Sequence, residues 1–106
     1  MGFMDFLSGS DINKAVEEYR ATPGAVLLDI RDKDEYAEGR IPGSVNIPLN
    51  SLGLVSDRIP RKDTPLFVYC LSGARSSRAV QFLQKNGYTA VKNIGGINRY
   101  RGELER

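Results

Sequence analysis

The chain has 106 residues, of which 41% are hydrophobic, so it has the length and apolar content of one ordinary domain with a single core. Its 15 basic and 13 acidic residues nearly balance, and a net charge of +2 gives no general reason to expect binding to nucleic acid or to an anionic membrane. Because there is one cysteine and no histidine, the sequence excludes Ser-His-Asp and Cys-His catalysis, the common zinc sites, C-x-x-C redox cycling and an intramolecular disulfide.

The sequence also bears on where the protein is found. No apolar run approaches the ~20 residues that a membrane-spanning helix requires, and residues 1–7 lack the basic start and longer apolar stretch of a secretory signal. Phe6 stands where an N-myristoylation motif requires Ser or Thr. We therefore expect a soluble, cytoplasmic protein.

The amino-terminal quarter predicts a short edge strand followed by a helix. Residues 3–7 are apolar enough for the strand, and Ser10 is a suitable helix N-cap. Apolar side chains then recur at the spacing of one helical face, at Ile12, Ala15, Val16 and Tyr19. Pro23-Gly24 ends this helix in a turn.

The next stretch predicts a buried strand followed by a short helix. Residues 25–30 form an apolar run interrupted only by Asp29, which is typical of a strand covered on both faces. Asp32 caps a brief helix that extends through Glu38 and stops at Gly39. The segments that follow are predicted as a turn over 41–43, an extended piece over 44–47 and a loop with one helical turn over 48–60.

The second half of the chain repeats the alternation of strand and helix. It predicts strands over 66–69 and 90–94, a helix over about 76–86 that ends at Gly87, a turn at Gly95-Gly96 and a last helix over 97–103. With the strands above, this pattern predicts an α/β fold with a mainly parallel five-stranded sheet and helices on both faces. No repeat or linker-like stretch divides the chain, so we expect a single domain over 1–106.

Cys70 stands at the end of a predicted strand, before a loop with Gly73 and a helix that begins near Ser76. Ligands bind at this end of parallel strands. Amides of the helix start and the charge of Arg75 would stabilise a thiolate there, so we expect the pKa of Cys70 to lie below its ordinary ~8.5. A lone cysteine after an apolar strand is usually a small core residue. A reactive thiol is favoured here, because Gly73, Arg75 and the start of the helix are all directed at Cys70.

The segment Cys70-Leu71-Ser72-Gly73-Ala74-Arg75-Ser76 resembles the active-site loop of the rhodanese family. Three other stretches match family motifs in the right order: 27–31 (LLDIR) resembles its strand ending in D-x-R, 35–48 (EYAEGRIPGSVNIP) its E-x-x-x-G-H-I-P-G-A-x-N-I-P stretch, and Gly95-Gly96 with Tyr100 its terminal G-G…W. The resemblance covers nearly the whole chain and implies a rhodanese-like fold. Two departures are Arg40, where many relatives have His, and Tyr100, where Trp is common.

The resemblance implies a sulfurtransferase. The Cys70 thiolate attacks the outer sulfur of a small anionic donor such as thiosulfate and becomes a persulfide, which then passes its sulfur to a thiol or a protein acceptor. No metal or organic cofactor is implied. The residues that hold the donor and the persulfide are those of the loop, Leu71, Ser72, Gly73, Ala74 and Arg75, with the amides acting as an oxyanion hole does and Arg75 attracting the donor.

Four residues are expected in supporting positions. In family members the residues matching Asp29 and Arg31 lie beside the cysteine loop, so Asp29 either braces the loop through amide or Arg75 contacts or is a simple N-cap and turn acid. Glu35 is either an ion-pair partner of Arg31 or Arg40 or an ordinary surface charge. Arg40 adds a permanent cation near the site and bears on substrate preference.

Two alternatives stay open. Cysteine phosphatases and arsenate reductase-like enzymes use a C-x5-R loop with the same strand, loop and helix, but Cys70 to Arg75 is C-x4-R, a ring too tight for a phosphoryl group yet suited to one sulfur atom. A non-catalytic rhodanese-like binding module would normally have lost the cysteine, the glycine or the arginine, and this chain has all three.

Overall fold

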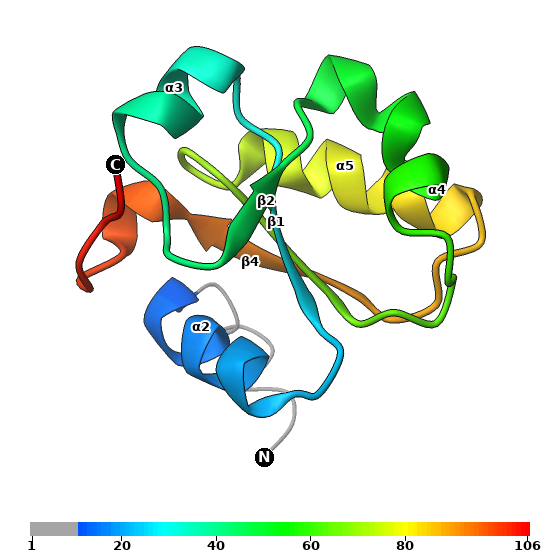
Figure 1. The fold of residues 1–106 in the computed structure, drawn as a ribbon, viewed down its shortest axis with the longest axis horizontal. Coiled ribbons are helices and arrows are strands. Elements are labelled where there is room, and N and C mark those ends of the chain that lie inside the picture. The colour runs from blue at the N-terminus through cyan, green and yellow to red at the C-terminus, as the bar shows by residue number, and fades with distance from the viewer. Residues whose placement is uncertain (1–10) are drawn as a thin grey trace.

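A parallel β-sheet forms the centre of this computed structural model, which describes residues 11–106 (Figure 1). The elements follow in the order α2 (Ile12–Ala21), β1 (Val26–Asp29), α3 (Lys33–Glu38), β2 (Ser44–Asn46), η2 (Leu49–Leu54), α4 (Val55–Arg58), β3 (Leu66–Cys70), α5 (Ala74–Lys85), β4 (Val91–Gly96) and η3 (Ile97–Arg99). The predicted strand over 3–7 and the predicted cap Ser10 lie outside the described residues. In the described chain, Asp11 caps α2 by accepting a hydrogen bond from the Asn13 amide.

The described residues form four strands rather than the predicted five, and all neighbours are parallel, in the order β2-β1-β3-β4. Asp29 of β1 lies opposite Tyr69 of β3, and Cys70 lies opposite Gly96 of β4. The carboxyl ends of the strands therefore meet at one edge of the sheet, and Cys70 lies on that edge.

Helices cover both faces of the sheet, as predicted, because side chains alternate along each buried strand. On one face Leu28, Val68 and Cys70 belong to a core that α5, α4 and η2 complete. On the other, Leu27, Phe67 and Tyr69 pack with α2 and Ile94. Figure 1 shows α2 on one side of the strands and α4 and α5 on the other. The two neighbours Tyr69 and Cys70 thus point into opposite cores.

The carboxyl-terminal part departs most from the predictions. Gly95 and Gly96 lie in β4 rather than in a turn, and the predicted helix over 97–103 is only the short 3-10 helix η3. Long-range hydrogen bonds hold the rest in a non-helical conformation: the Arg101 amide donates to Asn13 Oδ1 over 2.7 Å, and Arg40 and Glu105 exchange two backbone hydrogen bonds. A helix would have broken these contacts.

Other boundaries differ less. The predicted loop over 48–60 contains both η2 and α4, and α5 begins at Ala74 rather than near Ser76. Gly87, with a φ of 97°, adopts the left-handed conformation predicted for the end of α5. None of the helices within 11–106 has the length and apolar character needed to cross a membrane.

Candidate active site

The cysteine loop consists of three residues, Leu71 to Gly73, between the last residue of β3 and the first turn of α5. Gly73 has a φ of 109°, a conformation that side chains disfavour, and this turn directs the start of α5 at Cys70. Because α5 begins early, Arg75 and Ser76 lie in its first turn, where backbone amides lack partners within the helix.

Amides at the start of α5 converge on the sulfur of Cys70, a residue that is 1% exposed. Sγ accepts a hydrogen bond from the Gly73 amide over 2.9 Å and from the Ser76 amide over 3.4 Å, and the Ser76 hydroxyl lies 3.4 Å away. Burial raises the pKa of Cys70, but the Ser76 hydroxyl and the amides of Ser76, Gly73 and Ser72 together lower it below its ordinary value. The direction agrees with the prediction; the largest lowering effect comes from the Ser76 side chain, where we had expected Arg75 beside the amides.

Ser76 is held by Asn93 of β4, a residue that the sequence analysis did not select. The Ser76 hydroxyl lies 2.7 Å from Asn93 Oδ1 and 3.0 Å from the Gly73 carbonyl, and Asn93 Oδ1 also accepts from the Gly95 amide. Ser76 itself is fully buried. The polar Asn93 inside the strand predicted over 90–94 was the signal that could have pointed to this contact.

The loop packs directly on the backbone of β4, and Gly96 makes this possible. A Cβ atom at Gly96 would lie 2.3 Å from the Leu71 carbonyl oxygen and 2.5 Å from the Ser72 Cα, distances that real Cβ atoms do not show. The same atom on Gly73 would meet its nearest neighbour at an ordinary 3.6 Å. The close approach of the loop to β4 therefore depends on Gly96, while Gly73 is required for its positive φ.

Arg75 forms an ion pair with Glu35 of α3. The two terminal nitrogens of its guanidinium donate to Oε1 and Oε2 over 3.0 and 3.1 Å. Glu35 Oε1 also accepts from the Asp32 amide at the start of α3. The Arg75 hydrogen bonds lower the pKa of Glu35 against the opposing effect of burial. The predicted partners of Glu35, Arg31 and Arg40, were wrong, because it faces the cysteine loop.

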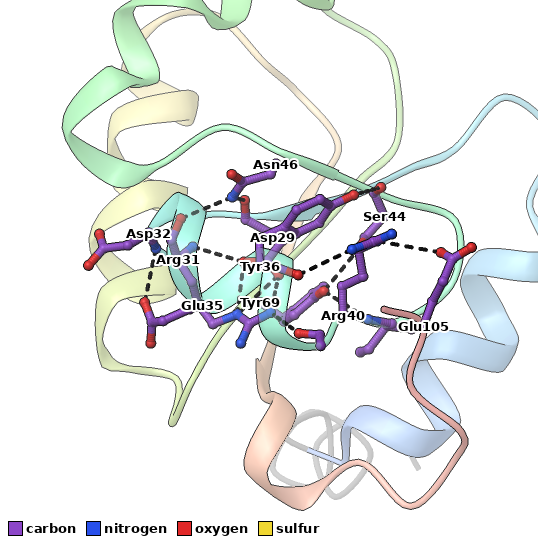
Figure 2. A network of polar contacts seen from close by, with 12 residues as sticks. Asp29, Arg31, Asp32, Glu35, Tyr36, Arg40, Ser44, Asn46, Tyr69 and Glu105 are labelled. Carbon is purple, nitrogen blue, oxygen red and sulfur yellow. Dashed lines mark hydrogen bonds and ion pairs between the residues drawn. The ribbon is translucent and has the colours of Figure 1, made fainter.

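Asp29 and Arg31 form a buried pair with each other, 0% and 5% exposed (Figure 2). Arg31 Nη2 lies 2.7 Å from Asp29 Oδ2, and the Arg31 amide donates to Asp29 Oδ1 over 2.8 Å. Arg31 also donates to the Gly39 carbonyl. The expected contacts of Asp29 with loop amides or Arg75 are thus replaced by Arg31, and the pair fixes the end of β1 against the end of α3.

Arg40 points away from the cysteine loop. Its guanidinium lies over the Tyr36 ring, 4.9 Å from the centroid, and its Nε is 3.6 Å from Glu105 Oε1 (Figure 2). The extra cation at this position is therefore partnered by the carboxyl-terminal segment.

A hollow of about 350 Å³ opens beside the cysteine loop. It is lined by the apolar side chains of Leu71, Ile97 and Leu104 and by residues of the α3 region that include Arg31 and Glu35. Leu71 is 45% exposed and Leu104 is 42% exposed. The site thus has a nucleophile held by amides, with an apolar surface next to it.

Comparisons with known proteins agree with this arrangement. Residues 12–103 match the model of the rhodanese-like domain. The chain is 41% identical over 91 residues to the uncharacterized protein YqhL of Bacillus subtilis, covering 84% of this chain and 71% of that protein. It is 34% identical over 99 residues to the human thiosulfate:glutathione sulfurtransferase, covering 81% and 84%.

Among solved structures, a rhodanese from Escherichia coli determined with anions superimposes with a TM-score of 0.72 at 29% identity, covering 77% of this chain and 98% of that one. The parallel sheet, the cysteine loop at its edge and the match over 12–103 lead to one conclusion: this chain belongs to the rhodanese-like domain family.

Proposed function

We propose that this chain is a sulfurtransferase that moves a sulfane sulfur from thiosulfate or a similar donor to a thiophilic acceptor through a Cys70 persulfide. The observation that supports it best is that the amides of Gly73 and Ser76 converge on Cys70 Sγ, with the Ser76 hydroxyl 3.4 Å away. These donors stabilise a thiolate at the end of β3, and a thiolate is the nucleophile that the reaction needs.

In the first step, the Cys70 thiolate attacks the outer sulfur of thiosulfate. A sulfur–sulfur bond forms to Sγ, the bond to the sulfonate sulfur breaks, and sulfite leaves with the electron pair of that bond. The product is a Cys70 persulfide anion, so charge is conserved. Loop amides from Leu71 to Arg75 would hold the terminal sulfur, as an oxyanion hole holds a developing charge.

In the second step, a thiolate or cyanide attacks the terminal sulfur and takes it, and Cys70 leaves as a thiolate. Cyanide yields thiocyanate, and a thiol yields a new persulfide. The similarity to a thiosulfate:glutathione sulfurtransferase supports a thiol acceptor, and a protein thiol would take the sulfur by the same chemistry. The proposal covers residues 1–106 as one rhodanese domain, with a cytoplasmic location as a further prediction.

The spacing of the loop speaks against a phosphatase. Three residues separate Cys70 from α5, and Arg75, the residue that would bind a phosphoryl group, is engaged by Glu35. A binding module is disfavoured because the cysteine, Gly73 and Arg75 are all present.

Mass spectrometry tests the proposal directly. After incubation with thiosulfate, the protein should gain the mass of one sulfur atom on Cys70, and cyanide should remove it with release of thiocyanate. Cys70→Ser should neither gain the mass nor produce thiocyanate, since a hydroxyl does not form a stable persulfide analogue. Thiocyanate production by Cys70→Ser at the wild-type rate would show that Cys70 is not the sulfur carrier.

A further inference from the structure

Arg75, the cation that follows the cysteine loop in the first turn of α5, is already neutralised by a carboxylate. Both terminal nitrogens of Arg75 donate to Glu35, and the two side chains are 34% and 29% exposed, so water reaches the pair without separating it. Glu35 is also fixed from its own side, because the Asp32 amide donates to it over 2.9 Å. Glu35 therefore does not follow Arg75 freely when Arg75 turns toward a ligand.

The other arginines of the matching motifs are paired as well. The pairs are Arg31 with Asp29 and Arg40 with Glu105. The attraction of Arg75 for an anionic donor is thus largely cancelled at long range by the charge of Glu35. At the loop, the donor must also compete with Glu35 for the Arg75 guanidinium. A doubly charged donor loses more from this cancellation than a singly charged one, because the lost attraction scales with the charge of the donor.

We propose that Glu35 is a specificity-determining residue that disfavours dianionic sulfur donors, so that the chain takes its sulfur preferentially from singly charged donors such as thiosulfonates or organic persulfides. This inference rests on the sulfurtransferase function proposed above. The apolar side chains beside the loop, Leu71, Ile97 and Leu104, offer a surface for the organic group that such donors carry and thiosulfate lacks.

The chemistry of the two donor classes is the same at the reacting atoms. With benzenethiosulfonate, the Cys70 thiolate attacks the outer sulfur, the sulfur–sulfur bond to the sulfonyl group breaks, and benzenesulfinate leaves with the electron pair. The Cys70 persulfide anion is the product, as with thiosulfate. The donors thus differ in net charge and in the organic group, and a comparison of variants with each donor separates the charge effect.

The test compares wild type, Glu35→Gln and Asp34→Asn, with thiosulfate and benzenethiosulfonate as donors and saturating cyanide as acceptor. Gln keeps an acceptor for the Asp32 amide while it removes the charge that holds Arg75. Asp34→Asn is the matched control, because Asp34 is an exposed acid on the same helix. In Glu35→Gln, kcat/KM for thiosulfate should rise, and its ratio to that for benzenethiosulfonate should rise about threefold, the effect of one unit charge a few ångströms away in a water-like dielectric.

Asp34→Asn should leave the ratio unchanged, and added salt should reduce the gain of Glu35→Gln. An unchanged or lower ratio in a folded Glu35→Gln protein would overturn the assignment. So would an equal fall with both donors, which would mean that the pair only holds the loop in place. If wild type transfers sulfur from neither donor, the proposed function itself fails, which is a different result from a failed charge effect.

Discussion

Replacing Ser76 with alanine tests how the site stabilises the thiolate. The change removes a hydroxyl that lies 3.4 Å from Cys70 Sγ and leaves the Ser76 amide in place. A hydrogen bond to a charged group contributes about 1.5 to 3 kcal/mol. The lower value applies here, because the distance is long and because Asn93 Oδ1 and the Gly73 carbonyl compete with the Cys70 thiolate for the one hydroxyl proton. Losing about 1.5 kcal/mol lowers the ratio of thiolate to thiol about tenfold at any given pH. The pKa of Cys70 should therefore rise.

The pH dependence of alkylation by iodoacetamide measures this change. Ser76→Ala should react about tenfold more slowly than wild type on the acid side of the profile and reach a similar plateau at high pH, where both are thiolates. Ser76→Thr restores the hydroxyl and should recover most of the reactivity. Identical profiles for wild type and Ser76→Ala would show that the backbone amides alone stabilise the thiolate and that the hydroxyl donates only to Asn93.

Three further predictions concern the frame of the site. Gly96→Ala should reduce sulfur transfer sharply while the protein stays folded, because the added Cβ overlaps the backbone of the cysteine loop. Wild-type turnover by this variant would show that β4 can shift to accommodate the added Cβ. Asp29→Asn leaves the buried Arg31 charge without its partner and should lower the free energy of unfolding by about 3 to 5 kcal/mol in urea titrations. The same substitution at the exposed Asp63 is the control and should change the free energy of unfolding little. The pKa of Glu35 is lowered in the folded chain, so its ion pair should stabilise the protein at any pH above the ordinary pKa of 4.5. This stabilisation should be lost as the pH falls through the lowered pKa. The stability difference between wild type and Glu35→Gln should therefore shrink in acid. A difference that stays constant on acidification would mean that the carboxylate contributes nothing through its charge.

Local patterns predicted much of the fold. The apolar runs around Leu28 and Val68 gave the two central strands, and the caps at Asp32 and Gly87 lie where their chemistry requires. The helix predicted over 97–103 failed because the deciding contacts are distant in sequence. Asn13 binds the Arg101 amide and Arg40 pairs with Glu105 just beyond the segment, and periodicity contains no information about these contacts.

The site shows the same division. The cysteine and its loop were accessible from the motif, since all the donors to Sγ come from residues within six positions of Cys70. Partners from other elements were not: Glu35 was assigned to the wrong arginines and Asn93 was overlooked. Charge pairing between α3 and α5 depends on how two helices meet over the sheet edge, which residue types alone do not determine.

The near-complete burial of Cys70 Sγ has a practical consequence for anyone who counts thiols in this protein. A bulky aromatic disulfide reagent cannot reach a sulfur beneath the loop until the loop lifts, so labelling of the native chain should be slow even though the thiolate is a good nucleophile. Its rate then reports how often this part of the molecule opens, much as exchange of a protected amide does. The labelling rate of the lone cysteine therefore measures local opening. Donor molecules that bind at the loop and slow the labelling can be ranked by that effect without any sulfur being transferred.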